Sequence, residues 1–279
     1  MTGAPADPGE SGPVSGHMLA GHTLTGHTLA GHMLTEDTLL GGRVRLRQPR
    51  DGLRAGLDAV MLAAAVPARP GERVLEAGCG SGAAFLCLAA RVPGLRVTAV
   101  ERDPVLAALA RANAEANGLA DRVEVLAGDI GDPALAHALA ASARFDHAFA
   151  NPPYWPGGTP PPADRRRAAV QEGEARLADW ARFLAAPLAW RGTLALVLPA
   201  ARLDAGLRAL GDSGCGGPLV VPLWPRDALP AKRVLLRAVR GGRGPSRLAP
   251  GIALHRPGGG WTKAAAAILD AGAAIPEPA

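Results

Sequence analysis

A short apolar strand that runs into a glycine-rich turn is the feature that most constrains the fold of this chain. Residues 73–82 read Arg-Val-Leu-Glu-Ala-Gly-Cys-Gly-Ser-Gly, and a helical pattern follows at 82–91. The glycines let the backbone approach a ligand closely, and the amino terminus of the following helix presents free N–H groups. We therefore expect a strand, a ligand-binding turn and a helix in succession.

Two further strand ends supply acidic side chains. The apolar run 96–100 ends in Glu101, about 20 residues after the glycine turn, where a carboxylate can accept hydrogen bonds from both hydroxyls of a ribose. The run 123–126 is followed by Asp129, whose carboxylate can accept a hydrogen bond from an adenine amino group. Three successive strand ends thus offer a glycine turn, a ribose acceptor and an adenine acceptor.

A fourth apolar run, 145–150, is closed by Asn151, Pro152, Pro153 and Tyr154, the only tyrosine of the chain. The two prolines fix the backbone and remove two amide donors. The turn suits a planar substrate that carries an NH2 group. The Asn151 side-chain oxygen and the Pro152 carbonyl can each accept one N–H, while Tyr154 stacks on the ring.

The other periodic segments alternate between strand and helix. Beyond a short strand at 42–49, the pattern predicts helices at 56–66, 82–91, 104–117, 173–188 and 204–210, and strands at 193–198, 218–223 and 233–239. Alternating strands and helices imply a parallel sheet with right-handed crossovers, whose ligand site lies at the carboxyl ends of the strands. All four motifs fall on that rim.

Together these motifs resemble the class I S-adenosylmethionine-dependent methyltransferases, and the Asn151 turn resembles the branch that methylates amino nitrogens of adenine or of glutamine amides. More narrowly, the chain resembles the bacterial tRNA(Val) adenine-N6 methyltransferase family in its opening and closing sections. The opening stretches are Asp37-Thr-Leu-Leu-Gly-Gly-Arg-Val, Gln48-Pro and the segment 52–63, and the closing ones are Pro230-Ala-Lys-Arg-Val, Leu254-His255, Thr262 and the later Ala-Ile-Leu. The resemblance runs from about residue 37 to about residue 269. It implies a Rossmann-like α/β fold with a mostly parallel seven-stranded sheet and helices on both faces.

The resemblance also implies methyl transfer from S-adenosylmethionine to the N6 of an adenine beside a tRNA anticodon, without a metal. The glycine turn would wrap the methionine part of the cofactor, with Glu76 near its amino group, Glu101 at the ribose and Asp129 at the adenine. The expected cofactor-binding residues are Glu76, Gly78, Cys79, Gly80, Gly82, Glu101, Asp129 and Asn151. The expected catalytic residues are Asn151, Pro152, Pro153 and Tyr154. Gln48 and Asp58 are candidates for closing the site, and Cys79 is also a small packing residue.

The first residues of the chain read as a low-complexity leader. A Gly-His-Met/Thr-Leu-Ala/Thr unit occurs four times from Gly16, and a five-residue step gathers the histidines on neither a helix face nor a strand face. We therefore predict a disordered leader at 1–35 with no metal site, a methyltransferase domain at 36–269 and a flexible tail at 270–279.

Charge, cysteines and hydropathy indicate the partners. The formal charge is +5, and because the first 42 residues hold four acids and no Lys or Arg, the remainder carries 30 minus 21, or +9. Such an excess favours an anionic partner, RNA and most simply tRNA. The three cysteines form no CxxC pair, and no apolar run reaches the ~18 to 20 residues of a membrane span. We expect a cytoplasmic monomer without membrane contact.

Four alternatives are weighed against this interpretation. Gly78, Gly80 and Ala83 satisfy the looser dinucleotide fingerprint, but nothing downstream resembles the site of a nicotinamide enzyme. A protein glutamine N5-methyltransferase acting on release factors shares the Asn151 turn, although such enzymes usually carry a helical domain ahead of the catalytic one. A DNA adenine methyltransferase would need a recognition insertion. A non-catalytic RNA-binding or cofactor-sensing protein would not need an intact Asn151 and Tyr154.

Overall fold

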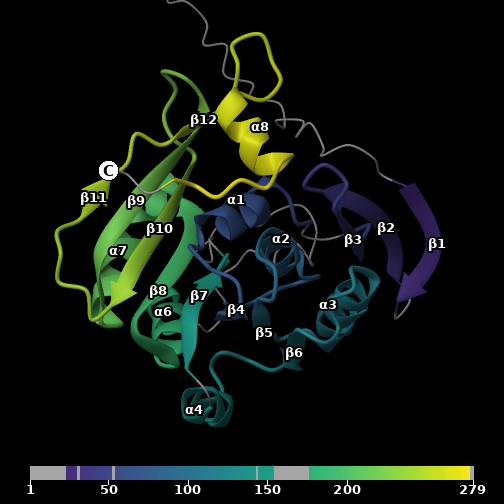
Figure 1. Ribbon diagram of the computed structural model, residues 1–279, viewed down its shortest axis with the longest axis horizontal. Helices are drawn as coiled ribbons and strands as arrows, with labels where there is room; N and C mark the ends of the chain where they lie inside the picture. Colours follow the sequence, from purple (N-terminus) through teal and green to yellow (C-terminus); the bar gives the residue numbers. More distant parts are fainter. Residues whose placement is uncertain (1–22, 30–31, 52–53, 143, 154–175, 277–279) are drawn as a thin grey trace, which may run out of the picture.

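The computed structural model describes residues 23–29, 32–51, 54–142, 144–153 and 176–276, and their main feature is one twisted sheet (Figure 1). Its strand order is β11-β9-β10-β8-β7-β4-β5-β6, with β12 also beside β9. The parallel strands are β4 (Arg73–Ala77), β5 (Arg96–Glu101), β6 (Val123–Ala127), β7 (Phe145–Ala150) and β8 (Leu188–Pro199). The antiparallel strands are β10 (Arg233–Arg240) and β9 (Cys215–Arg226).

The predicted Rossmann-like sheet is confirmed in these seven strands. The sheet is wider than predicted, because the short strands β11 (Arg247–Leu248) and β12 (Ile252–His255) add to the far edge of β9, parallel to it. β11 has only two residues, and the sequence Ile-Ala-Leu-His of β12 does not alternate apolar with polar residues, although its burial does, so neither gives the sequence signal used to recognise strands.

Helices cover both faces of the sheet, as predicted (Figure 1). One face carries α1 (Leu57–Ala65), α2 (Ala83–Arg91), α3 (Pro104–Ala116) and α8 (Lys263–Leu269). The other carries α4 (Pro133–Ala141), α6 (Leu177–Ala185) and α7 (Leu203–Asp212), which follows the short 3-10 helix η1 (Ala200–Arg202). Side-chain alternation explains the two layers: Val197 on β8 belongs to the first core, whereas Leu196 and Leu198 belong to the second.

A separate antiparallel sheet lies beside the main one and consists of β1 (Thr23–Leu29), β2 (His32–Leu39) and β3 (Val44–Pro49). Its first strand and the beginning of its second fall inside the segment predicted to be a disordered leader, so the predicted boundary at residue 35 divides β2. The prediction considered which faces the histidine repeat can bury. Hairpin pairing of β1 with β2 uses backbone hydrogen bonds, which that criterion does not detect.

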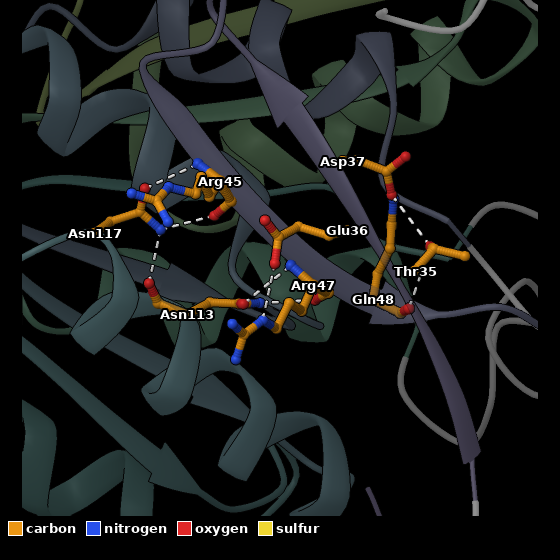
Figure 2. A network of polar contacts seen from close by, with 8 residues as sticks. All are labelled: Thr35, Glu36, Asp37, Arg45, Arg47, Gln48, Asn113 and Asn117. Carbon is orange, nitrogen blue, oxygen red and sulfur yellow. Dashed lines mark hydrogen bonds and ion pairs between the residues drawn. The ribbon is translucent and has the colours of Figure 1, made fainter. Parts of the chain in front are cut away.

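Two asparagines of α3 join this small sheet to the main domain (Figure 2). Asn113 accepts from the backbone N–H of Arg47 (3.0 Å) and donates to its carbonyl (2.7 Å). Asn117 makes the same two bonds with Arg45, at 2.9 and 2.7 Å. Four residues along a helix advance about 6 Å and two residues along a strand advance about 6.7 Å, so the two spacings match. The two side-chain amides thus take the place of a neighbouring strand along β3.

The described ranges contain no group of three or more His, Cys, Asp or Glu side chains arranged to hold a metal ion. Within the same ranges, no helix has the length and apolar character required of a membrane-spanning segment. Cys79, Cys87 and Cys215 are free and buried, and burial raises the pKa of each thiol.

Candidate functional site

A cavity of about 510 Å³ opens at the carboxyl ends of the parallel strands. Strand register explains why the four motifs meet there. Ala77 of β4 is paired with Val100 of β5 and Ala150 of β7, so the segments that follow these residues leave the sheet side by side. The predicted site residues that line the cavity are Glu76, Gly78, Cys79, Gly80, Asp58, Glu101, Asp129, Asn151, Pro152 and Pro153.

Glycine is required at two points of the turn for different reasons. Gly78 has a φ of +66°, and a Cβ there would lie 2.6 Å from a ring atom of Trp180 on α6. Gly82 has a φ of +96° and begins α2, where a Cβ would meet the ring of Phe85. Gly82 is not among the residues that line the cavity and is the N-cap of α2, so its predicted contact with the cofactor stays a prediction.

Glu101 holds the glycine turn in place. One carboxylate oxygen accepts from the backbone N–H of Gly80 (2.8 Å), and the other accepts from the N–H of Asp103 (2.9 Å). An ionised carboxylate offers about four lone-pair sites, so capacity remains for the hydroxyls of a ligand. The sequence predicted an acid at this place, but it contained no signal that the acid also fixes the turn.

Glu76 is a buried carboxyl on the cavity wall, 3% exposed. Desolvation by burial raises its pKa well above the ordinary value. The N–H of Phe85, which donates to it at 3.0 Å, acts in the opposite direction, and the negative charge of Glu101 raises the pKa further. A cationic group in the cavity would stabilise the charged form of this carboxyl, so the site suits a ligand with an ammonium group.

Asp129, which follows β6, and the Asn151 turn, which follows β7, also line the cavity. Asp129 accepts from the N–H of Gly131 (2.8 Å) and remains 45% exposed at its side chain. Pro152 is buried, whereas Asn151 and Pro153 are half-buried. Tyr154 lies outside the described residues, so its predicted stacking role stays a prediction.

Trp180 is a cavity residue that the sequence analysis missed. It projects from α6 and its ring lies against Gly78. Nothing in the sequence distinguishes it from the other four tryptophans, because its place depends on how α6 packs across the end of β4.

Another part of the cavity wall consists of the segment that begins at Arg54 and enters α1. Gln48, a predicted closing residue, does not line the cavity and is 2% exposed. Its oxygen accepts from the N–H of Ala55 (2.8 Å), and its nitrogen donates to Asp37 (2.7 Å). Arg54 also donates to Asp37, at 2.6 Å. The small sheet therefore supports one wall of the cavity through a buried polar network.

Asp58, the other predicted closing residue, lies on the cavity wall itself. Its carboxylate accepts from the guanidinium of Arg233 at 2.9 Å, which links the first turn of α1 to the start of β10. Both residues line the cavity, and both are partly buried.

Comparison with known proteins identifies related sequences and folds. The family described as "Methyltransferase domain" matches residues 74–157. A tRNA1(Val) (adenine(37)-N6)-methyltransferase from Porphyromonas gingivalis is 36% identical over 169 residues, which cover 58% of this chain and 64% of that one. Namesakes from Dickeya chrysanthemi and Aeromonas hydrophila are each 33% identical, and the matches cover 69% of this chain and 75% and 79% of theirs.

Among solved structures, a predicted O-methyltransferase from Agrobacterium tumefaciens has a TM-score of 0.66 and 27% identity. The match covers 78% of this chain and 98% of that one, and it supports the class I methyltransferase fold. With the first three curated relatives the match spans 64%, 60% and 66% of their length, which is under two thirds in each case.

Proposed function

This chain belongs to the family of the tRNA1(Val) (adenine(37)-N6)-methyltransferases, and on that premise we propose that it transfers a methyl group from S-adenosylmethionine to the N6 amine of an adenine in tRNA. The observation that carries the proposal is one cavity that gathers the glycine turn, two acidic strand ends and the Asn151 turn. A dinucleotide site would need the first two features but has no use for the third.

The carboxylates of the cavity fit this cofactor. Glu76 is a buried carboxyl that suits the ammonium group of the methionine portion, and Glu101 keeps acceptor capacity for the ribose. Asp129 is exposed enough to accept from an adenine amine. When bound, S-adenosylmethionine supplies an electrophilic methyl group on its sulfonium.

The Asn151 turn would activate and position the target amine. The lone pair of an exocyclic adenine nitrogen is delocalised into the ring, which makes the amine a poor nucleophile. Hydrogen bonds from its two N–H groups to the Asn151 side-chain oxygen and the Pro152 carbonyl favour the pyramidal form, whose lone pair points at the cofactor. The rate enhancement would come from positioning of the amine and from preorganised dipoles, because the prolines fix the backbone of the turn.

The adenine must leave its stack to reach the cavity, at a cost of a few kcal/mol. Stacking on the predicted Tyr154 would offset part of that cost. The +9 charge of residues 43–279 favours binding of the RNA backbone and makes that binding salt-dependent.

The choice of substrate is tested with labelled S-adenosylmethionine. We expect the full chain to place label on total tRNA, recovered as N6-methyladenosine after digestion to nucleosides, and to leave peptide-chain release factors unlabelled. Label on a glutamine of the release factors with none on tRNA would contradict the tRNA substrate and identify the chain as a protein glutamine methyltransferase. The cofactor site would stand as described.

The support of the cavity wall by Gln48 gives a second prediction. Gln48→Leu removes the acceptor of the Ala55 N–H and one donor to Asp37, so the wall before α1 should loosen. Leaving a buried polar group unpaired costs about 1 to 3 kcal/mol, and we expect cofactor affinity to fall by roughly tenfold together with a lower Tm.

The matched control lies on the same strand. Arg47→Ala removes only a partly exposed ion pair with Glu36 (3.1 Å), which is worth about 0 to 1 kcal/mol, and its backbone bonds to Asn113 remain. Calorimetric titration of both variants measures the effect. Equal cofactor affinity in Gln48→Leu and the parent chain would show that this network does not shape the site.

A further inference from the structure

A second cavity, of about 220 Å³, lies at the opposite end of the sheet, where β4, β5 and β6 begin. Arg73 of β4 and Arg96 of β5 are paired in register. Val97 and Val123 are paired on the next two strands, so the residue before Val123, which is Arg122, continues the same row. All three arginines line this cavity. We call Arg73, Arg96 and Arg122 the arginine row.

A row of like charges on neighbouring strands is unfavourable unless something compensates it, because paired residues project to the same face at short range. Compensation within the described residues is incomplete. The guanidinium of Arg73 packs over the ring of Phe145 at 5.6 Å, and its buried Nε has no hydrogen-bond acceptor there. Neither Arg73 nor Arg96 forms an ion pair with any carboxylate of the described residues.

The nearby carboxylates are weakly placed for this task. Asp146, beside the row on β7, already accepts from the backbone N–H of Arg73 at 2.9 Å. Asp121 approaches Arg122 only to 3.9 Å and is 80% exposed at its side chain. Glu124 also lines the cavity but is exposed. The cavity is therefore lined by three arginines and by two carboxylates that are exposed to solvent.

We propose that the arginine row binds a phosphate group. Each guanidinium offers a planar fork of N–H donors that matches phosphate and carboxylate oxygens. Three such forks offer about six N–H donors, more than the roughly four lone-pair sites of one carboxylate can accept, whereas a phosphate has more acceptor oxygens. The cavity is smaller than the ~300 to 1,000 Å³ typical of sites for larger ligands, so it takes a small phosphate or one phosphate of a longer chain.

This inference does not depend on the proposed methyl transfer. The five residues of β4 separate the arginine row from the glycine turn by about 16 Å, at ~3.3 Å per residue. A phosphate bound here does not touch a ligand in the larger cavity, so loss of the site should leave turnover at saturating tRNA unchanged.

The test is calorimetric titration of the full chain with inorganic phosphate and pyrophosphate. We expect Arg96→Gln and Arg122→Gln each to weaken phosphate binding by at least about tenfold, the factor for one charge-assisted hydrogen bond. The control is Arg256→Gln, which removes the same charge from an exposed loop residue and should leave phosphate affinity as in the parent chain. Melting curves without phosphate check that each variant is folded, and Arg96→Gln should melt no lower than the parent because it relieves like-charge repulsion.

Competition identifies the source of the phosphate. Displacement of bound phosphate by oligouridine, which offers a phosphodiester chain without adenine, would assign the row to the RNA backbone, and failure to displace it would assign the row to a free phosphate compound. The proposal is overturned if the parent chain does not bind phosphate, or if folded Arg96→Gln and Arg122→Gln bind it as tightly as the parent does.

Discussion

We expect Asn151→Ala to lower kcat for methyl transfer by a factor on the order of 10² to 10³, the loss typical of one preorganised polar group at a transition state. The variant loses the proposed side-chain acceptor of the target amine and keeps the prolines that shape the turn. Because that interaction strengthens as the amine becomes pyramidal, the loss should appear in kcat more than in the affinity for cofactor. Single-turnover transfer of labelled methyl groups to tRNA measures it.

A second amide truncation provides the control. Asn117→Ala also removes a side-chain amide, but one that joins α3 to β3 and lies outside the cavity, so single-turnover transfer should persist. Parent-like transfer by Asn151→Ala would mean that the turn only ends β7 and that another group handles the amine.

The second large effect is expected at Glu101. Glu101→Ala removes the acceptors of two backbone N–H groups, from Gly80 and Asp103, together with those proposed for the ribose. Charge-assisted hydrogen bonds of this kind are worth roughly 1.5 to 3 kcal/mol, so cofactor affinity should fall by about 10- to 150-fold. Calorimetry with S-adenosylmethionine gives the value directly.

Two comparisons make this prediction specific. Glu101→Gln should not rescue binding fully, because its amide must turn an NH2 group toward one of the two N–H donors. Glu115→Ala removes an exposed carboxylate from α3, outside the cavity, and should bind cofactor as the parent does. Unchanged affinity in Glu101→Ala, or tighter binding of NAD than of S-adenosylmethionine, would contradict the cofactor assignment.

Features of the site that depend on strand ends could be predicted from the sequence. An apolar run followed by a glycine turn, an acid or Asn-Pro-Pro is a local signal, and parallel pairing then brings such ends together at one edge. The start of α3 is also marked by a local signal in the sequence. Asp103 directly precedes Pro104, the first residue of the helix, and accepts hydrogen bonds from the backbone N–H groups of Val105 and Leu106.

What could not be predicted depends on contacts distant in sequence. Trp180 reaches the cavity only through the packing of α6, and Gln48 acts from behind the wall rather than on it. Helix α4 was missed although Asp132 caps it, because of its nine residues only Leu139 is buried and its apolar positions show no face. Strand β1 was missed because backbone pairing leaves little trace in the side-chain pattern of a five-residue repeat.

The hydrogen bonds between the side-chain amides of Asn113 and Asn117 on α3 and the backbone of β3 also bear on self-association. The outer edge of a sheet exposes backbone groups that can template the addition of a strand from another molecule. On β3 those groups are occupied at Arg45 and Arg47 by Asn117 and Asn113, which offer no further backbone to continue the pairing. The helix thus terminates the small sheet on this side. A further strand in its place would pair with β3 but expose a new edge of its own, whereas the two side chains leave no edge for another molecule to pair with here.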